Sequence, residues 1–150
     1  MSLKERLYED MKTAMRARGE GKLRLSVIRL ARAAIKNTEI DRLHELNDDE
    51  VIEVLARELK MRRDAMEEYK RVNRPEQADL LRQEAEILKE YLPAQMSEDE
   101  VRGLVRTVIA DTGAQTIKDI GLVMGKLSAL TKGKADGRFV NQIVRELLAD

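Results

Sequence analysis

The sequence predicts an all-α protein in two parts: an N-terminal helical domain of four helices over residues 1–93 and a smaller three-helix domain over residues 94–150. Apolar residues recur at steps of three and four in seven segments, whereas the strict alternation typical of a β-strand is nearly absent. Only two prolines and eight glycines interrupt the 150 residues. Hydrophobic residues make up 43% and charged residues 37%, a mixture that can bury a core and differs from that of disordered chains.

Two apolar stripes predict the first two helices. Residues 3–18 carry the first stripe: Leu3, Leu7, Met11, Ala14 and Met15. Gly19 and Gly21 then end that helix. The second stripe follows directly: Leu23, Val27, Leu30, Ala31 and Ala34. Because Leu25 and Ile28 add apolar surface on other sides, we expect this second helix to be the central one of its bundle.

A third helix is predicted to begin after Asn47, since Glu50 follows at the spacing of a capping box. Its inner face holds the apolar residues of the segment: Ile52, Leu55, Leu59, Met66 and Tyr69. On the other faces, acids and bases stand four residues apart, as Glu58 and Arg62 do. We interpret these charges as a solvated surface, in which each pair contributes only about 0.2–0.5 kcal/mol.

Pro75 predicts the start of a fourth helix, because proline is favoured at the first helical position. Its apolar residues again recur at steps of three and four: Ala78, Leu81, Ala85, Leu88 and Leu92. The helix stops before Pro93, which cannot donate a backbone hydrogen bond and restricts the residue before it. We interpret residues 91–96 as a short hinge between the two domains.

The C-terminal domain is marked by helix caps. Ser97 and Glu100 form a capping box that starts a fifth helix, which ends near Gly113. Thr116 is predicted to cap a sixth helix, and Asp136 a seventh helix after the loop at residues 131–137. The apolar residues of the three helices are Val101, Leu104, Val105 and Val108, then Ile117, Ile120, Met124 and Leu127, then Val140, Ile143, Val144, Leu147 and Leu148.

The charges of the chain balance in total but not locally. There are 28 Lys plus Arg against 28 Asp plus Glu, yet residues 1–36 have a net charge of +6 and residues 37–93 a net charge of −6. The chain has no cysteine, which excludes disulfides, thiolate nucleophiles and cysteine-based zinc sites. The N-terminus has no apolar signal segment and no run approaches the length of a membrane span. We therefore expect a cytoplasmic protein with no membrane partner.

Three segments resemble, in the expected order, the YqeY family: residues 30–37 (LARAAIKN), residues 90–97 (EYLPAQMS) and residues 121–125 (GLVMG), the last followed by residues 132–137 (KGKADG). YqeY-like proteins are similar to the helical and tail portions of GatB. GatB is a subunit of the glutamine-dependent amidotransferase that converts misacylated Glu-tRNA(Gln) or Asp-tRNA(Asn). The resemblance implies a two-part helical fold with a GatB-tail-like C-terminal domain and a link to tRNA.

The resemblance also brings the family label of a carbon–nitrogen ligase with glutamine as amido-N-donor. In the amidotransferase, phosphorylation and amide transfer belong to a separate cradle domain and a separate amidase subunit, for which this chain has no room. The tail is the part associated with gripping tRNA. This sequence departs from the family at residues 73–79 (NRPEQAD), where a glycine-containing segment is usual, so no role is carried over to that turn.

The loop at residues 132–137 is the first candidate site for RNA phosphate. Lys132 and Lys134 flank a glycine, and Asp136 stands where it can cap the next helix. Helix N-terminal amides together with lysine side chains suit a phosphate group. Lys126 and Arg138 would widen this patch. An ordinary polar loop with an N-cap remains the alternative.

A second basic segment lies within the first two helices. Residues 12–36 hold eight bases against one acid, Glu20, and the bases we consider as RNA contacts are Lys22, Arg24, Arg29 and Arg32. The following segment carries the opposite excess of charge. The basic residues therefore equally suit a solvated or internally paired surface, or the docking of a partner.

The sequence gives little support for a phosphate loop, a metal site or a catalytic centre. Gly121 and Gly125 enclose three residues where a phosphate loop needs four, and Leu127 stands where such a loop needs Ser or Thr. We interpret the two glycines as a site of close helix packing. His44 is the only histidine and has no neighbouring ligand, so no metal site is expected. No nucleophile or acid–base pair can be singled out, so we predict no catalytic residues and no cofactor.

The functional hypothesis that follows is a non-catalytic, tRNA-associated helical module. Tyr69, Tyr91 and Phe139 lie at or beside apolar positions and are predicted to belong to the core, so recognition would be of RNA backbone and shape. One alternative is a protein-interaction adaptor that docks on an amidotransferase or an aminoacyl-tRNA synthetase. The other is the ligase activity that the family label implies.

Overall fold

The computed structural model describes residues 1–149, and this part of the chain is helical without any strand, which confirms the all-α prediction. The chain divides into two compact units, Met1–Pro93 and Ala94–Asp150. Each unit is packed around its own hydrophobic cluster. Among the described residues, no helix has the length and apolar character needed to cross a membrane.

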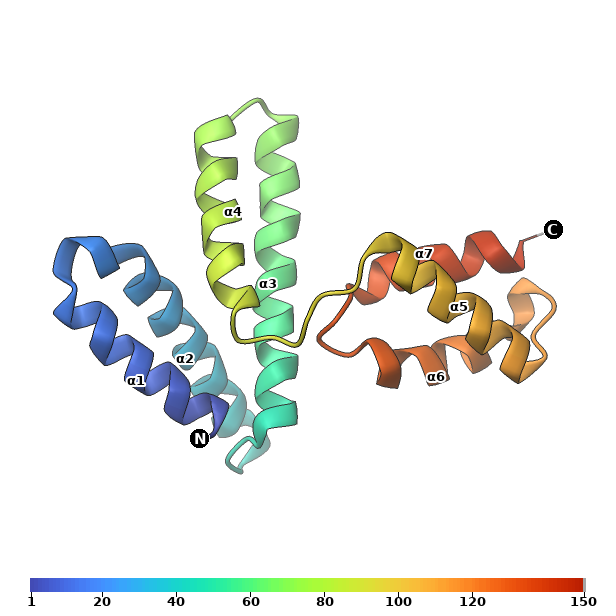
Figure 1. Ribbon diagram of the computed structural model, residues 1–150, viewed down its shortest axis with the longest axis horizontal. Helices are drawn as coiled ribbons and strands as arrows, with labels where there is room; N and C mark the ends of the chain where they lie inside the picture. Colours follow the sequence, from blue (N-terminus) through green and yellow to red (C-terminus); the bar gives the residue numbers. More distant parts are fainter. Residues whose placement is uncertain (150) are drawn as a thin grey trace. The chain divides into compact units, whose positions relative to one another are not determined.

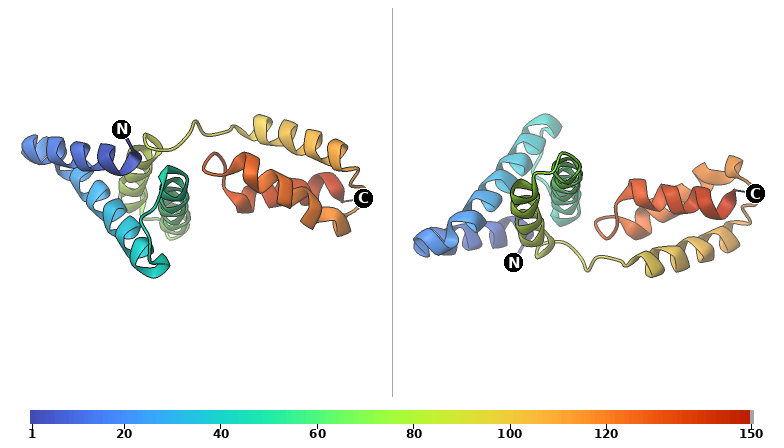
Figure 2. Two further views of the ribbon diagram at one scale, coloured as in Figure 1. Left: turned by 90° about the horizontal axis from the view of Figure 1, so that it is seen from below. Right: turned by 90° about the horizontal axis from the view of Figure 1, so that it is seen from above.

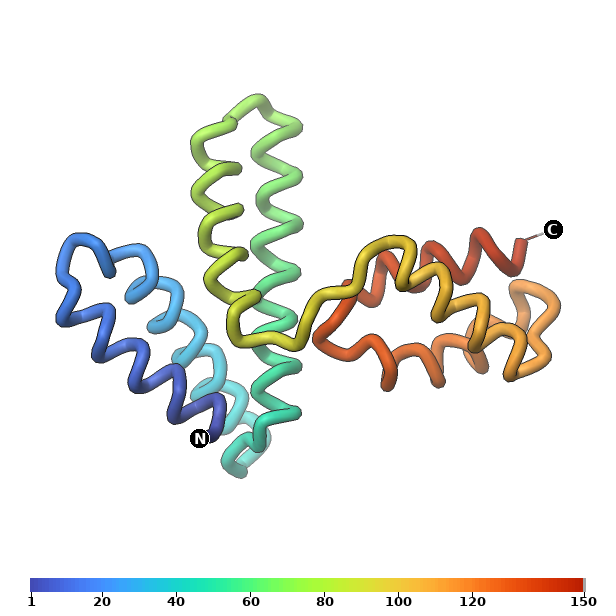
Figure 3. The backbone as a smooth tube through the Cα atoms, in the orientation of Figure 1, coloured from blue at the N-terminus to red at the C-terminus, as the bar shows by residue number. Residues whose placement is uncertain are grey.

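The N-terminal unit consists of two antiparallel helical hairpins (Figures 1 and 3). The first hairpin is formed by α1 (Leu3–Arg16) and α2 (Lys22–Arg42), and the second by α3 (Asp48–Arg71) and α4 (Pro75–Lys89). Both α2 and α3 contact every other helix of the unit. The buried core includes Leu7, Val27, Ile28, Ala31, Ile35, Val51, Val54, Leu55, Leu59, Ala85, Leu88 and Tyr91.

The turn between α1 and α2 is tighter than the sequence predicts. The first helix ends at Arg16 rather than Arg18, and a short 3₁₀ helix, η1 (Arg18–Gly21), leads directly into α2. Gly21 is buried, and a Cβ at this position would lie 2.2 Å from the carbonyl oxygen of Ala14. The two helices can therefore approach this closely only because residue 21 has no side chain.

The first hairpin also exposes apolar residues that were predicted to lie inside. Met15 is 48% exposed and Leu30 is 52% exposed, so neither belongs to the buried stripe of its helix. Ile40 on α2 is 60% exposed. The second helix is therefore not buried on all sides, although it contacts α1, α3 and α4 as a central helix does.

Local signals set the starts of α3 and α4 as predicted, whereas α4 ends at Lys89, before the predicted end at Leu92. Asn47 and Glu50 form a reciprocal capping box, and Pro75 occupies the first turn of α4. Between the two helices, Asn73 has a φ angle of 59°, in the left-handed region. Asparagine tolerates this region better than most residues other than glycine. Asn73 thus lets the chain make this turn without a glycine.

One ion pair that we predicted to be solvated is instead largely buried. Arg62 is only 8% exposed, and its Nε lies 3.3 Å from Glu84 Oε1 on α4. Its Nη1 donates to the carbonyl oxygen of Glu58 at 3.1 Å and lies 3.5 Å from Glu58 Oε2. The guanidinium thus joins α3 to α4, which the spacing of residues along a single helix does not reveal.

We expect Arg62→Met to destabilise the N-terminal unit by about 2 kcal/mol, because it leaves two half-buried carboxylates without their counter-charge. The loss is smaller than for a fully buried pair, since the Glu58 and Glu84 side chains remain 17% and 18% exposed. Urea unfolding followed by circular dichroism measures it. Lys60→Met is the matched control, because the Lys60–Asp64 pair on the same helix is solvated and its loss should cost under about 0.5 kcal/mol.

Equal losses in the Arg62 and Lys60 variants would contradict a structural role for the Arg62 contacts.

The C-terminal unit contains α5 (Glu98–Thr112), the 3₁₀ helix η2 (Ile117–Asp119), α6 (Ile120–Thr131) and α7 (Gly137–Leu148). Each α-helix of this unit packs against the other two (Figure 2). Its fully buried residues include Val101, Val105, Val123, Leu127, Val140, Ile143 and Val144. The unit therefore has a complete small core of its own.

The caps of the C-terminal helices form as predicted. Ser97 and Glu100 make a reciprocal capping box, and Gly113 ends α5 with a φ angle of 71°. The Thr116 side chain accepts a hydrogen bond from Lys118 N, although the helix that it starts is the 3₁₀ helix η2 rather than α6 itself. Each of these signals involves groups within four residues of one another, which is why the sequence reveals them.

The two glycines of α6 do not have the role that we predicted. Gly121 and Gly125 are exposed, and no atom of the C-terminal unit comes within 4 Å of where a Cβ would stand. Leu122 and Leu130 on the same helix are 55% and 49% exposed. The prediction of close helix packing at the glycines is therefore wrong within this unit.

Candidate functional site

The loop between α6 and α7, residues 132–136, has a defined shape. The backbone N–H groups of Lys134 and Ala135 both donate to the carbonyl oxygen of Thr131, at 2.8 Å and 3.1 Å. Gly133 takes a φ angle of 73°, which other residues adopt only with strain. These bonds close a tight turn at the end of α6.

Residues 95 and 96, which precede α5, hold this loop by two hydrogen bonds. The Gln95 side chain donates to the carbonyl oxygen of Gly133 at 2.7 Å, and Met96 N donates to the carbonyl oxygen of Lys134 at 2.9 Å. Residues 95 and 96 thus belong to the C-terminal unit, although we interpreted them as part of a hinge. Nothing in the local sequence signals these contacts, because the partners are 38 residues apart.

We call Lys126, Lys132, Lys134 and Arg138 the cationic loop cluster. All four residues are exposed, on α6, on the loop and at the start of α7. Within residues 94–149, no carboxylate lies at ion-pairing distance from Lys126, Lys134 or Arg138. The loop therefore presents positive charge at its surface.

Asp136 changes the electrostatics of the start of α7. Its Oδ1 accepts a hydrogen bond from Arg138 N at 3.0 Å, so it caps the helix as predicted. This carboxylate already satisfies one of the backbone donors that we considered for a phosphate. Any anion here would consequently depend on the side chains of the cationic loop cluster more than on the helix N-terminus.

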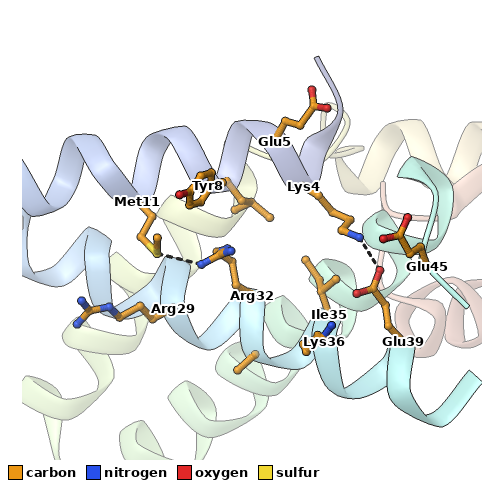
Figure 4. Close-up of a pocket in the computed structure, with 12 residues that line it drawn as sticks. Lys4, Glu5, Tyr8, Met11, Arg29, Arg32, Ile35, Lys36, Glu39 and Glu45 are labelled. Atoms are coloured by element: carbon orange, nitrogen blue, oxygen red, sulfur yellow. Dashed lines mark hydrogen bonds and ion pairs between the residues drawn. The ribbon is translucent and has the colours of Figure 1, made fainter. Parts of the chain in front are cut away.

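A second candidate site lies in the N-terminal unit, in a groove of 630 Å³ between α1 and α2 (Figure 4). We call it the α1–α2 groove. Its lining combines apolar and charged side chains: Lys4, Glu5, Leu7, Tyr8, Met11, Arg29, Arg32, Ala33, Ile35, Lys36, Glu39 and Glu45. Two of the basic residues that we selected from the sequence, Arg29 and Arg32, belong to this lining.

At one end of the groove, Arg32 has no carboxylate partner in the described chain. Its Nη1 donates to the thioether sulfur of Met11 at 3.1 Å, and its guanidinium lies 5.1 Å from the centre of the Tyr8 ring. Lys12 Nζ lies 4.7 Å from the same ring, and Tyr8 is 44% exposed. Lys12 is already paired with Glu9, at 2.9 Å, so Arg32 is the cation at this end whose partners are weak and neutral.

At the other end of the groove, which we call its closed end, the charges are already paired. Lys4 Nζ lies 2.6 Å from Glu39 Oε2, which also accepts a hydrogen bond from Leu46 N at 2.9 Å (Figure 4). The hydrogen bond from Lys4 and, to a smaller extent, the one from Leu46 N lower the pKa of Glu39 below its ordinary value. Glu39 therefore stays ionised and is already neutralised by Lys4.

The other basic candidates of the first two helices do not gather with Arg29 and Arg32. Arg24 forms a two-pronged contact with Glu90, with distances of 2.5 Å and 3.3 Å, and this hydrogen bonding raises the pKa of Arg24. Lys22 is exposed at the start of α2. Arg24 is therefore paired within the protein, which was one of the alternatives for the basic segment. Arg29 and Arg32 instead line the groove.

The sequence did not point to Tyr8 and Met11 as parts of a site. We placed Met11 only in the apolar stripe, and we predicted no role for Tyr8. The signal was present, because both residues fall on the same face of α1 as Lys4 and beside Leu7. The sequence did not reveal that α2 forms the opposite wall of the groove.

Two of the three aromatic residues assigned to the core are only partly buried. Tyr91 is 4% exposed and Tyr69 and Phe139 are half-buried. The Tyr91 hydroxyl donates to Asp10, and burial followed by this hydrogen bond raises the pKa of Tyr91. Tyr91 thus ties the end of the second hairpin to α1.

The described residues contain no group of three or more His, Cys, Asp or Glu side chains placed to hold a metal ion. His44 is exposed, with Nδ1 2.8 Å from the carbonyl oxygen of Glu45 and Nε2 3.6 Å from Glu50 Oε2. These contacts explain the position of the ring by interactions with its own neighbours.

The described part of the chain is thus an all-helical protein with two small hydrophobic cores, a cationic loop and a groove of mixed lining. The model of the Yqey-like protein family matches residues 4–148, nearly the whole chain. The protein therefore belongs to the Yqey-like family, which confirms the resemblance seen in three segments of the sequence. None of the curated proteins compared with the chain matches it.

Proposed function

We propose that this protein is a non-catalytic, tRNA-associated helical module, and that its C-terminal unit contacts the tRNA phosphate backbone through the cationic loop cluster. The observation that carries the proposal is the loop at residues 132–136, which four hydrogen bonds hold in one shape while Lys132 and Lys134 remain exposed. A preformed loop loses little backbone entropy when it binds, so more of the electrostatic attraction remains as affinity.

The chemistry of the cluster suits phosphate groups rather than bases. Lysine and arginine side chains bind phosphate oxygens, which position a protein on RNA without reading its sequence. The aromatic residue of the C-terminal unit, Phe139, is half-buried against the core and offers no open platform for a stacked base. The resemblance of this unit to the tail of the amidotransferase subunit supports tRNA as the RNA.

The proposal predicts that Lys132→Gln with Lys134→Gln weakens tRNA binding and lowers its dependence on salt. Loss of two phosphate contacts should reduce the slope of log affinity against log salt concentration by roughly 1.5 to 2. Fluorescence anisotropy with labelled total tRNA, over a series of salt concentrations, measures both quantities. The purified full chain serves as the wild type.

The matched control is Arg106→Gln with Lys118→Gln, which removes two exposed cations of the same unit outside the cluster. This control should keep the wild-type slope, and circular dichroism should show that both double variants are folded. An unchanged slope in the Lys132 and Lys134 variant would refute the role of the loop. Absence of tRNA binding by the wild type at low salt would refute the proposal as a whole.

A further inference from the structure

The α1–α2 groove combines apolar and charged side chains in one lining. Its accessible apolar lining is formed by Tyr8, which is 44% exposed, with Met11 and Ala33, whereas Leu7 and Ile35 line it from the buried core. The apolar part of the lining favours a protein segment with an apolar ridge over an RNA strand, whose contacts with cationic side chains are made through its phosphates. Glu5 and Glu45 also line the groove, so acidic residues of that segment have to lie toward the cations of α2.

The charges of the groove indicate that this segment is acidic. Arg29, Arg32 and Lys36 line the groove from α2, and no carboxylate of residues 1–149 lies at ion-pairing distance from any of them. Arg32 is left with a sulfur atom and an aromatic ring as partners. A carboxylate would replace that contact with a charge-assisted hydrogen bond, which is roughly twice as strong as a neutral one.

The spacing of these cations matches a helix. They stand at positions i, i+3 and i+7 of α2, which places them about 4.5 Å and 10.5 Å apart along the helix axis. Acidic residues at the same spacing on a helix lying alongside α2 would face all three. A groove between two packed helices accepts a third helix through apolar residues at positions i, i+3 or i+4, and i+7.

We propose that the α1–α2 groove binds an acidic amphipathic helix of a partner protein. The apolar face of that helix packs between α1 and α2, and its acidic residues pair with Arg29, Arg32 and Lys36. At the closed end, where Glu39 is already neutralised by Lys4, the partner needs no acid. This interaction uses the N-terminal unit alone and is independent of the RNA contact proposed for the C-terminal unit.

The test uses three labelled 18-residue peptides with the same leucine pattern at positions i, i+3, i+4 and i+7. They carry Glu, Gln or Lys at the positions flanking the leucines. Fluorescence anisotropy with the full chain should show that the Glu peptide binds at least about tenfold more tightly than the Gln peptide, while the Lys peptide binds least. An equal affinity for all three peptides, or no binding of the Glu peptide, would overturn the proposal.

Variants of the chain locate the site. Arg29→Gln with Arg32→Gln should weaken the Glu peptide by about tenfold or more, and Ala33→Phe should block it by filling the groove with a larger exposed side chain. Arg16→Gln with Lys22→Gln is the control, because it removes two exposed cations of the same helices outside the groove and should leave binding unchanged. Equal losses in the groove variant and the control would overturn the proposal.

Two further arms distinguish this site from RNA binding. A labelled twelve-nucleotide uridine oligomer should show no dependence on Arg29 and Arg32, and groove-dependent binding of that oligomer without binding of the Glu peptide would reassign the groove to RNA. The Lys132→Gln with Lys134→Gln variant should bind the Glu peptide as the wild type does. Failure of tRNA binding would therefore not count against the groove proposal. Failure of the Glu peptide to bind would likewise not count against the tRNA proposal.

Discussion

Replacing Gly21 with alanine should destabilise the N-terminal unit by about 3 kcal/mol, at the upper end of what overpacking usually costs. The added Cβ would lie 2.2 Å from the carbonyl oxygen of Ala14 and 2.9 Å from its carbonyl carbon. Both are backbone atoms of α1, so the clash cannot be relieved by a side-chain rotation. The whole of α1 would have to move away from α2.

Urea unfolding measured by circular dichroism gives the change in free energy for Gly21→Ala. Gly19→Ala is the matched control, because nothing lies within 4 Å of a Cβ at that position in the same turn, and its effect should stay within about 0.5 kcal/mol. Separation of the helices should also abolish binding of the Glu peptide, since α1 and α2 form the two walls of the groove. Equal stabilities of the two alanine variants would contradict this account of the turn.

Leu127→Ala should have a comparable effect on the C-terminal unit. Leu127 is 0% exposed at the centre of that core, and leucine-to-alanine changes at such sites cost about 2–5 kcal/mol. A domain this short has little stability in reserve, so we expect the unit to be largely unfolded at 37 °C. Amide hydrogen exchange should show loss of protection in α5, α6 and α7, with α1 to α4 still protected.

Leu130→Ala is the control for this change, because Leu130 lies on the same helix and is 49% exposed. It should leave amide protection in both units close to that of the wild type. The Leu127 variant also separates the two proposals, since it should lose tRNA binding and keep the Glu peptide. Simultaneous loss of protection in both units would show that they do not fold independently.

The sequence alone predicted the features that depend on neighbours along the chain. Helical periodicity predicted the all-α class, and the capping boxes at Asn47 and Ser97 predicted where α3 and α5 begin. Pro75 and Gly113 likewise marked a helix start and a helix end. These features are visible because each depends on groups only a few residues apart. The family was visible as well, because three separate segments carry its motifs.

The sequence also identified cationic residues without showing what surrounds them. Lys132 and Lys134 were selected for their charge, but the hydrogen bonds from Gln95 and Met96 that hold their loop come from a segment far along the chain. Arg24 was selected on the same ground as Arg32. The fold pairs Arg24 with Glu90 and leaves Arg32 beside Met11, a difference that no local pattern encodes.

Periodicity and caps by themselves determined which segments of this protein are helices and where most of them start and stop, because those choices depend on contacts within one or two turns. Only the tertiary structure decided which helix faces meet. It buried Arg62 between α3 and α4, left Gly121 and Gly125 exposed on α6, and opened a groove between α1 and α2. Each of these outcomes depends on the partner helix, whose position is set by the packing of the entire unit rather than by the residues nearby in sequence.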